Sequence, residues 1–184
     1  PGSSVAVFGC GGVGLNVVQG AAIVGARQII AVDLLRNKLE MADDMGATHI
    51  VDASNEDPVA RIQELTGGMG ADYAFEAIGS PTTIQQAFHS VHSGGTCVVI
   101  GVSPSGAEVT LKTSMISPER TLMGVSFGGA RQMADLPMLV DMYMDGRLKL
   151  DEMISSRIGL DGVNDAFDAM RKGEAARQVI VFDA

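Results

Sequence analysis

The first 128 residues alternate short apolar runs with longer amphipathic stretches, a pattern typical of a parallel sheet with crossover helices. The apolar runs are continuous rather than alternating, as expected of strands that are covered on both faces. They predict strands at residues 5–8, 29–32, 49–51, 73–77, 96–100 and 121–126, and a further short strand at 108–111. Helices are expected between them at residues 13–26, 36–45, 58–66 and 81–91, the third with Asp57 as its N-cap.

This order of elements predicts a doubly wound α/β fold with a six-stranded parallel sheet, right-handed crossovers and strand order 3-2-1-4-5-6. Beyond residue 128 the pattern changes. We expect there a long amphipathic helix at 130–144, a weak strand at 153–158, a helix at 161–171 with Asp161 as N-cap, and a closing strand at 178–182. The chain is therefore expected to contain two parts, residues 1–128 and 129–184.

The first predicted strand runs directly into a G-x-G-x-x-G motif, which an apolar helical segment follows. In dinucleotide sites the first glycine makes the tight turn, the second lets backbone approach the pyrophosphate, and the third lets the helix pack against the strand. The N-terminus of that helix offers free N–H groups and the positive end of a dipole. The motif predicts the phosphate-binding loop of a Rossmann sheet, made by Gly9, Gly11, Gly12, Val13 and Gly14.

Asp33 ends the second predicted strand, 19 residues after Gly14. A carboxylate at this point accepts hydrogen bonds from a ribose 2′-hydroxyl and repels a 2′-phosphate, which favours NAD over NADP. Two alternatives remain open from these residues. The glycines could form a turn in an unrelated α/β domain, or the chain could be an S-adenosylmethionine methyltransferase, which also places glycines after the first strand and an acid after the second.

Composition narrows the remaining possibilities. The net charge of −9 and the pI near 4.6 argue against nonspecific binding to nucleic acid or to an anionic membrane. No apolar run approaches the roughly 18 residues of a membrane span. Cys10 and Cys97 are far apart and form no C-x-x-C motif, so we expect neither a disulfide nor structural zinc, and a cytoplasmic location.

Other candidate residues are weaker. His89 and His92 are three residues apart on what is expected to be one helix, a spacing that could hold a metal, but no third ligand is evident and a solvated helix face is expected. Cys10 lies next to the predicted helix N-terminus, where a thiol pKa can be lowered; we interpret it as a packing residue. No G-x-S-x-G motif, P-loop lysine or proton-transfer pair is present, so no catalytic residue and no metal ligand is assigned.

Several stretches together make the chain resemble the medium-chain zinc-type alcohol dehydrogenases. They are Pro1-Gly2 before the glycine motif, Ala31-Val32-Asp33 with Lys38, Met45-Gly46-Ala47-Thr48, Phe75-Glu76-Ala77-Ile78-Gly79, Val99-Ile100-Gly101-Val102, Phe127-Gly128-Gly129, and Gly173-Glu174-Ala175-Ala176-Arg177. The resemblance extends over all 184 residues. Within the family the chain looks close to the bacterial branch that includes nicotinoprotein and thiol-dependent formaldehyde-oxidising members.

The resemblance implies a particular architecture and activity. In this family a zinc-bearing catalytic domain precedes the nucleotide domain, and the chain returns to it at the end. The sequence is thus expected to be the nucleotide domain plus the returning segment, with the ligands of the catalytic and structural zinc ions in a preceding part. The implied activity of the parent protein is NAD-dependent hydride transfer between an alcohol or aldehyde and nicotinamide, with this chain inactive alone.

The resemblance also implies roles for individual residues. Lys38 would lie near the adenosine ribose, whereas without the resemblance it would be a solvated helix charge. Arg36, to which the resemblance gives no role, is expected to be a surface charge or to lie against the adenine. Backbone at Ile78, Gly79, Ile100, Gly101 and Val102 would contact adenine, nicotinamide ribose and carboxamide, Ser126 and Phe127 would contact the carboxamide, and Arg177 would reach a phosphate. Family members often dimerise by pairing sixth strands, so a homodimer is expected.

Two other functions remain open. A stand-alone NAD-binding or NAD-sensing module would carry the same glycine loop with no enzyme attached. A zinc-free relative such as a quinone reductase is the second alternative; these proteins usually prefer NADP and lack the acid at the position of Asp33.

Overall fold

The computed structural model describes residues 1–173 and 175–182, and the chain divides into two compact units, Pro1–Ala130 (unit 1) and Arg131–Ala184 (unit 2). In unit 1, strands and helices alternate as expected. Its strands are β1 Ser4–Phe8, β2 Gln28–Asp33, β3 His49–Asp52, β4 Ala71–Glu76, β5 Val91–Val99 and β6 Thr121–Gly124. Its helices are α1 Gly12–Ile23, α2 Arg36–Asp44, α3 Pro58–Leu65, α4 Pro81–Ser90 and the short α5 Thr113–Ile116, and a 3₁₀ turn, η1, follows at Phe127–Gly129.

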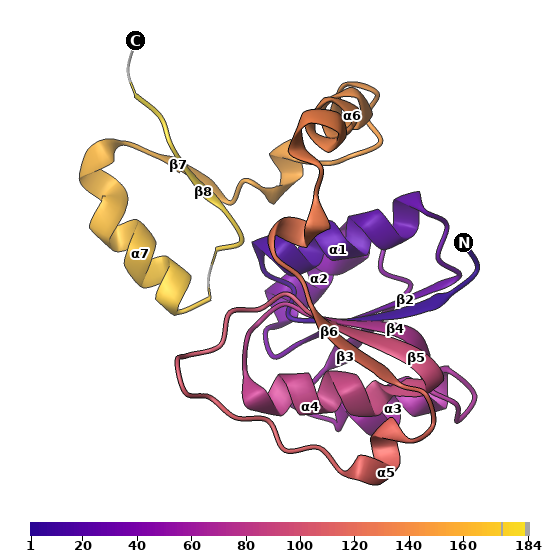
Figure 1. Cartoon of the computed structure of the whole chain (residues 1–184). Coiled ribbons are helices and arrows are strands. Elements are labelled where there is room, and N and C mark those ends of the chain that lie inside the picture. The colour runs from indigo at the N-terminus through magenta and orange to yellow at the C-terminus, as the bar shows by residue number, and fades with distance from the viewer. Residues whose placement is uncertain (174, 183–184) are drawn as a thin grey trace. The chain divides into compact units, whose positions relative to one another are not determined.

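The six strands of unit 1 form one parallel sheet in the order β3-β2-β1-β4-β5-β6, which confirms the predicted doubly wound topology. In Figure 1, α1 and α2 lie over one face of this sheet and α3 and α4 over the other. In a sheet of this kind the strand order reverses beside β1, so loops from β1 and β4 meet at the carboxyl edge.

The core of unit 1 lies on both faces of the central strands. All five residues of β1 are buried, and so are the first five residues of β2. On the α3/α4 face, Phe8 and Phe88 are each 1% exposed, and they pack with Ile30, Val32 and Ile62 in one cluster. Burying a Phe side chain contributes about 1.5–3 kcal/mol, which fixes these helices and the loops at their N-termini to the sheet.

The other face of the sheet is less completely covered. The connection between β5 and β6 contains only the four-residue helix α5, whose Met115 packs against the cluster on the α3/α4 face, so this connection adds no helix to the α1/α2 face. A pocket of about 590 Å³ remains between α1 and strands β4–β6, lined by apolar side chains that include Val17, Val24, Phe75, Val98 and Val125. Within the described residues, no helix is both long and apolar enough to cross a membrane.

Unit 2 is a helix followed by a small α/β arrangement. It contains α6 Gln132–Met144, η2 Asp151–Met153, β7 Ser156–Ile158, η3 Leu160–Gly162, α7 Val163–Arg171 and β8 Gln178–Ile180. Strands β7 and β8 pair in parallel. The prediction that Asp161 is the N-cap of α7 is wrong, because Asp161 lies inside η3 and Gly162 is the N-cap of α7.

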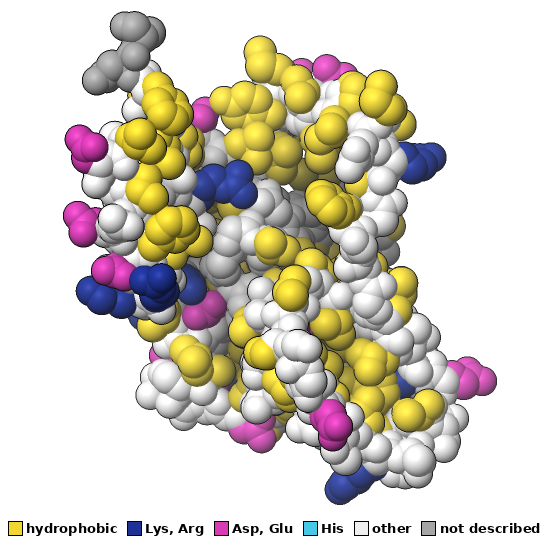
Figure 2. All heavy atoms as spheres, turned by 60° about the vertical axis from the view of Figure 1, so that its left-hand side comes forward, with side chains coloured by type: hydrophobic (Ala, Val, Ile, Leu, Met, Phe, Trp, Pro, Cys, Tyr) yellow, Lys and Arg dark blue, Asp and Glu magenta, His cyan; other side chains and the backbone are white. Residues whose placement is uncertain are grey.

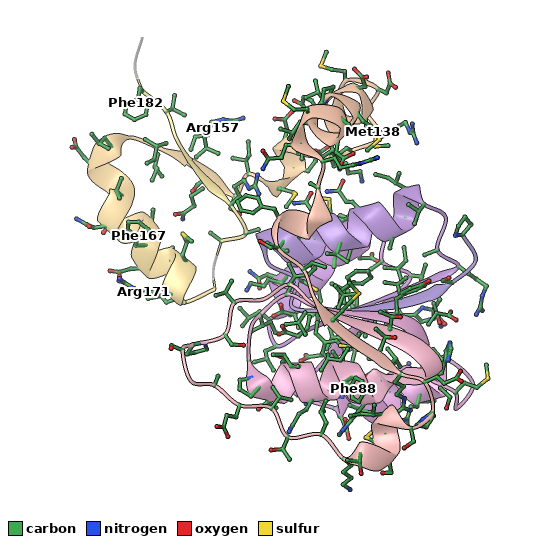
Figure 3. The ribbon with its side chains drawn as sticks, viewed as in Figure 1. Phe88, Met138, Arg157, Phe167, Arg171 and Phe182 are labelled. Carbon is green, nitrogen blue, oxygen red and sulfur yellow. The ribbon has the colours of Figure 1, made fainter. Side chains whose placement is uncertain are left out.

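Apolar side chains in unit 2 are largely exposed. Among its described residues, only Leu148 and Met153 are buried hydrophobic residues. Met138, Phe167 and Phe182 are 46–70% exposed, in contrast to Phe88 of unit 1 (Figure 3). Figure 2 shows many hydrophobic side chains at the molecular surface. Exposed apolar surface of this kind marks an interaction surface.

Two further expectations for unit 1 are wrong. Residues 108–111 form no strand, since β6 already occupies the edge position beside β5. His89 and His92 do not share a helix, because α4 ends at Ser90 and β5 begins at once with Val91. His89 is partly buried and His92 lies on the strand, so neither belongs to a solvated helix face.

His92 instead joins a polar cluster at the amino edge of the sheet. The Asp72 carboxylate on β4 accepts hydrogen bonds from the Ser4 backbone N–H (2.6 Å) and hydroxyl (2.7 Å) on β1, and it contacts His92 Nε2 at 3.0 Å. Bonds from the Ser4 backbone and side chain lower the pKa of Asp72 to about 2. The hydrogen bond to Asp72 raises the pKa of His92, against an opposing effect of burial and of Arg120.

These shifts predict a stability maximum in weak acid. Asp72 stabilises the fold above its ordinary pKa near 3.8 and loses this effect as the pH falls toward 2. His92 stabilises the fold fully below its ordinary pKa near 6.5 and loses this effect as the pH rises through its raised value. Both side chains are about a third exposed (31% and 39%), so the contribution of the pair stays below about 1 kcal/mol.

We therefore expect the unfolding free energy of the unmutated chain to decline as the pH rises above about 6.5, and the variant His92→Gln to lack this decline. Urea unfolding at pH 5, 6.5 and 8.5 measures it. The control His49→Gln keeps the decline, because it leaves the pair intact. A parent chain whose unfolding free energy does not fall across this range would contradict the assignment.

Candidate functional site

The glycine motif forms the loop between β1 and α1. Gly9 turns the chain at φ +91°, and its N–H donates to the Val32 carbonyl at 2.8 Å. Helix α1 begins at Gly12 after the N-cap Gly11. Among the described residues, no side chain caps this helix and no acid lies in its first turn. Its first N–H groups and the positive end of its dipole are therefore available to an anion.

Sterics separate the roles of the glycines. A Cβ atom at Gly14 would clash with the backbone carbonyl oxygen of Gly9, so α1 can approach the end of β1 only with glycine there. A Cβ at Gly9 would lie 2.5 Å from Cγ1 of Ile78. A Cβ at Gly11 would meet no described atom within 4 Å. The fold thus requires Gly14, whereas Gly11 borders open space where a ligand could approach the backbone.

Asp33, at the end of β2, braces this loop. Its Oδ2 accepts the Cys10 N–H at 2.8 Å, and its Oδ1 accepts the N–H groups of Leu34 (2.8 Å) and Leu35 (3.0 Å). The side chain is only partly buried. A carboxylate has about four acceptor positions, so Asp33 retains capacity for a further donor from a ligand.

A pocket of about 590 Å³ lies beside Asp33 at the carboxyl edge of the sheet. It brings together four of the residues predicted from the sequence, Gly9, Asp33, Lys38 and Ile78. Its remaining lining includes Leu34, Leu35, Ser80, Thr82, Thr83 and Gln86, none of which the sequence analysis selected. Apolar side chains and polar groups converge here around one carboxylate and one ammonium group, as in sites for small molecules.

The loops after β4 and β5 cross closely. A Cβ at Gly79 would clash with the Val102 backbone, and a Cβ at Gly101 would clash with the backbone N of Gly79. Both glycines are therefore required for this contact. Val102 itself is 90% exposed, and Ile100 lines the apolar pocket between α1 and the sheet rather than the pocket beside Asp33.

Ser126 and Phe127 follow β6 and do not line the pocket beside Asp33. Phe127 is 85% exposed and has φ +50°, which is uncommon for a bulky residue. Such a conformation is often associated with ligand or partner contacts. Arg177 belongs to unit 2, where it is exposed and its carbonyl accepts the Ser155 N–H at 2.7 Å. Glu174, quoted in the resemblance, and residues 183–184 of the second expected part lie outside the described residues.

Glu76 is a site residue that the sequence analysis missed. It ends β4 as Asp33 ends β2, and its side chain is fully buried. Its carboxylate accepts the N–H groups of Ile78 and Gly79 and the Thr83 hydroxyl. An acid at the end of an apolar strand followed by x-x-Gly was the signal that could have selected it.

Cys10 is a buried residue of the glycine loop. Its burial is the largest cause, and the nearby Asp33 carboxylate the second, that raises the pKa of its thiol to about 12. The suggestion that the helix N-terminus lowers this pKa is wrong, while the interpretation as packing agrees with the burial. Both cysteines are free and buried. Among the described residues, no group of three or more His, Cys, Asp or Glu side chains could hold a metal ion.

Comparisons with known proteins place this geometry in a family. The family model described as zinc-binding dehydrogenase matches residues 12–145. The S-(hydroxymethyl)glutathione dehydrogenase of Paracoccus denitrificans is 40% identical over 188 residues, which cover 98% of this chain and 50% of that protein.

Solved structures agree. Benzyl alcohol dehydrogenase from Acinetobacter calcoaceticus superposes with a TM-score of 0.95 at 32% identity, covering 100% of this chain and 50% of that one. A structure from Sinorhizobium meliloti 1021 with NADP bound superposes with a TM-score of 0.82 at 32% identity, covering 90% and 48%. The chain thus spans about half the length of the relatives it matches.

The two glycines with different surroundings give a matched test. Gly14→Ala is expected to destabilise the chain by at least about 2 kcal/mol, because backbone must move to accept the methyl group. Gly11→Ala is expected to cost only about 0.5–1 kcal/mol, because glycine is preferred to alanine at this N-cap but a Cβ there meets no described atom within 4 Å. Thermal and urea unfolding of both variants measure the difference. Equal stabilities would show that α1 does not pack as described.

Proposed function

Because the chain belongs to the zinc-binding dehydrogenase family, we propose that it is the cofactor-binding part of an NAD-dependent, zinc-dependent alcohol dehydrogenase. The observation that carries the proposal is the pocket beside Asp33, next to a glycine loop that opens an uncapped helix. This arrangement offers N–H groups for a pyrophosphate and a carboxylate for a ribose within one edge of the sheet.

In this proposal the pyrophosphate lies against the backbone of Gly11, Gly12 and Val13, where a Cβ at Gly11 would meet open space. The adenosine ribose donates to Asp33, and the Lys38 ammonium lies on the same pocket wall. The adenine occupies the pocket between the β2 end and the first turn of α4, against Ile78.

The nicotinamide half of the cofactor is assigned to the loops after β5 and β6. Support comes from the close crossing of Gly79 and Gly101, which places the loop that bears Val102 at the same edge as the glycine motif. The exposed Phe127, with its positive φ, supports a contact in that region. The proposed phosphate contact of Arg177 requires unit 2 to reach unit 1, and it rests on the family resemblance alone.

Among the described residues, no group of three or more His, Cys, Asp or Glu side chains is placed to hold a catalytic zinc. We therefore propose that a further part of the parent protein supplies zinc and most of the alcohol pocket, and that this chain alone binds nucleotide without turning over alcohol. We assign residues 129–184, which include unit 2, to the catalytic domain of the parent protein. The exposed apolar side chains of unit 2 support this assignment. The substrate is an alcohol or aldehyde, and the location is cytoplasmic.

The choice of NAD over NADP rests on Asp33. A related structure contains NADP, so the fold by itself does not exclude that cofactor. At the ribose position a carboxylate repels a 2′-phosphate and accepts a 2′-hydroxyl. A zinc-free quinone reductase would prefer NADPH, a stand-alone NAD-binding or NAD-sensing module would share the NADH preference, and a methyltransferase would bind neither nucleotide.

We expect the unmutated 184-residue chain to bind NADH at least about tenfold more tightly than NADPH. The substitution Asp33→Asn is expected to reduce this ratio of affinities by weakening NADH binding. The emission of the reduced nicotinamide, followed in a titration with protein, measures both affinities. The control Asp52→Asn changes a carboxylate at the end of β3 that does not line the pocket, and it keeps the parent ratio.

An equal or tighter affinity for NADPH would contradict the assignment of Asp33 and favour the zinc-free alternative. Binding of neither nucleotide would overturn the proposed function as a whole.

We also propose a homodimer that pairs two β6 edges. The sheet ends at β6, and all four residues of that strand are exposed, with Leu122 41% and Met123 45% exposed. Unpaired strand edges with apolar side chains associate readily, and natural monomers protect them with charges.

Light scattering is expected to give twice the 19.1 kDa mass of one chain, and Leu122→Lys to shift the equilibrium to monomer. Met69→Lys, at a 74% exposed position in the turn after α3, is the control and leaves the dimer intact. A parent chain that is monomeric at micromolar concentration would refute the β6 pairing.

A further inference from the structure

Glu76 has an unusual position for a charged residue, because its side chain is fully buried and cannot touch a ligand. Its Oε1 accepts the N–H of Ile78 at 3.0 Å, the N–H of Gly79 at 2.8 Å and the Thr83 hydroxyl at 2.7 Å. Its Oε2 accepts a second contact from the Gly79 N–H at 3.1 Å. A buried carboxylate is tolerated only where donors of this kind replace water.

The same residue also anchors the loop after β5. Its main-chain carbonyl accepts the N–H groups of Ile100 at 2.8 Å and Gly101 at 3.0 Å. The side chain and backbone of one residue therefore hold both loops that cross at Gly79 and Gly101.

Helix α4 depends on this carboxylate as well. Its N-cap residue, Ser80, makes no capping bond with its side chain. The carboxylate of Glu76 instead bonds to Thr83 in the first turn of α4, near the positive end of the helix dipole. Ser80, Thr83 and Ile78 all line the pocket beside Asp33.

Glu76 thus positions one wall of the proposed nucleotide pocket although its own side chain does not line the pocket. We infer that Glu76 is a positioning residue for the nucleotide: it sets cofactor affinity by fixing Ile78, Gly79 and the start of α4, without touching the cofactor. This inference rests on the proposed function, since it concerns the affinity of the same pocket.

The test compares nucleotide affinity with stability in the full 184-residue chain. Glu76→Gln keeps the volume but places an NH₂ group where one oxygen accepted Gly79, and Glu76→Asp keeps the charge but shortens the reach to all three donors. Each is expected to raise the Kd for NADH at least about tenfold, measured on folded protein well below its unfolding temperature. Amide exchange at Ile78 and Gly79 is expected to accelerate in both variants without nucleotide.

The matched control is Asp57→Ala. It removes the N-cap of α3, where the Asp57 carboxylate accepts the Val59 N–H at 2.9 Å, and Asp57 does not line the pocket. It is expected to lower the unfolding temperature, with the Kd for NADH unchanged within about twofold. A purely structural role for Glu76 would give its variants the same behaviour as this control.

The outcomes separate the two proposals. If the parent chain binds NADH and a folded Glu76 variant binds within about twofold of it, the inference is overturned while the proposed function stands. If the parent chain binds no NADH, both are overturned. If Glu76→Gln fails to fold, Glu76→Asp decides by the same measurement, and failure of both to fold while Asp57→Ala folds overturns the inference in favour of a structural role.

Discussion

The close approach of α1 to the end of β1 is the contact on which the carboxyl edge of this protein depends. It is possible only because Gly14 has no Cβ to meet the Gly9 carbonyl. The approach brings the first N–H groups of α1 to the point where the sheet reverses its order, beside the loop after β4. An anion can then be bound by backbone alone, which suits a chain that carries a net charge of −9.

Two acids complete this edge, each with its oxygens directed at backbone N–H groups. Asp33 bonds to Cys10 in the glycine loop, and Glu76 bonds to Ile78 and Gly79 in the next loop. Asp33 remains partly accessible, whereas Glu76 is fully buried. An acidic residue thus ends each of the two strands that flank β1, and the degree of burial separates the proposed ligand contact of Asp33 from the loop support given by Glu76.

Elsewhere in the chain, apolar surface is left exposed to water. An apolar pocket remains between α1 and β4–β6, and unit 2 buries few of the hydrophobic residues described in it. Apolar surface left in water contributes nothing to stability, so both features are expected to be covered in the proposed parent protein. The relatives are about twice as long as this chain, so they contain additional residues that could cover the apolar pocket and the apolar side chains of unit 2.

The sequence alone determined the glycine loop and every helix of unit 1 except α5, because helix periodicity and glycine spacing are local properties of the chain. It predicted the strand order only with the general rules for crossovers in doubly wound sheets. It also selected Gly9, Asp33, Lys38 and Ile78, which the fold gathers around one pocket. Only the tertiary structure decided the roles of Glu76 and His92, and it removed the strand expected at 108–111. Burial, cross-strand hydrogen bonds and the occupancy of a sheet edge depend on residues far apart in the chain, which no local pattern encodes.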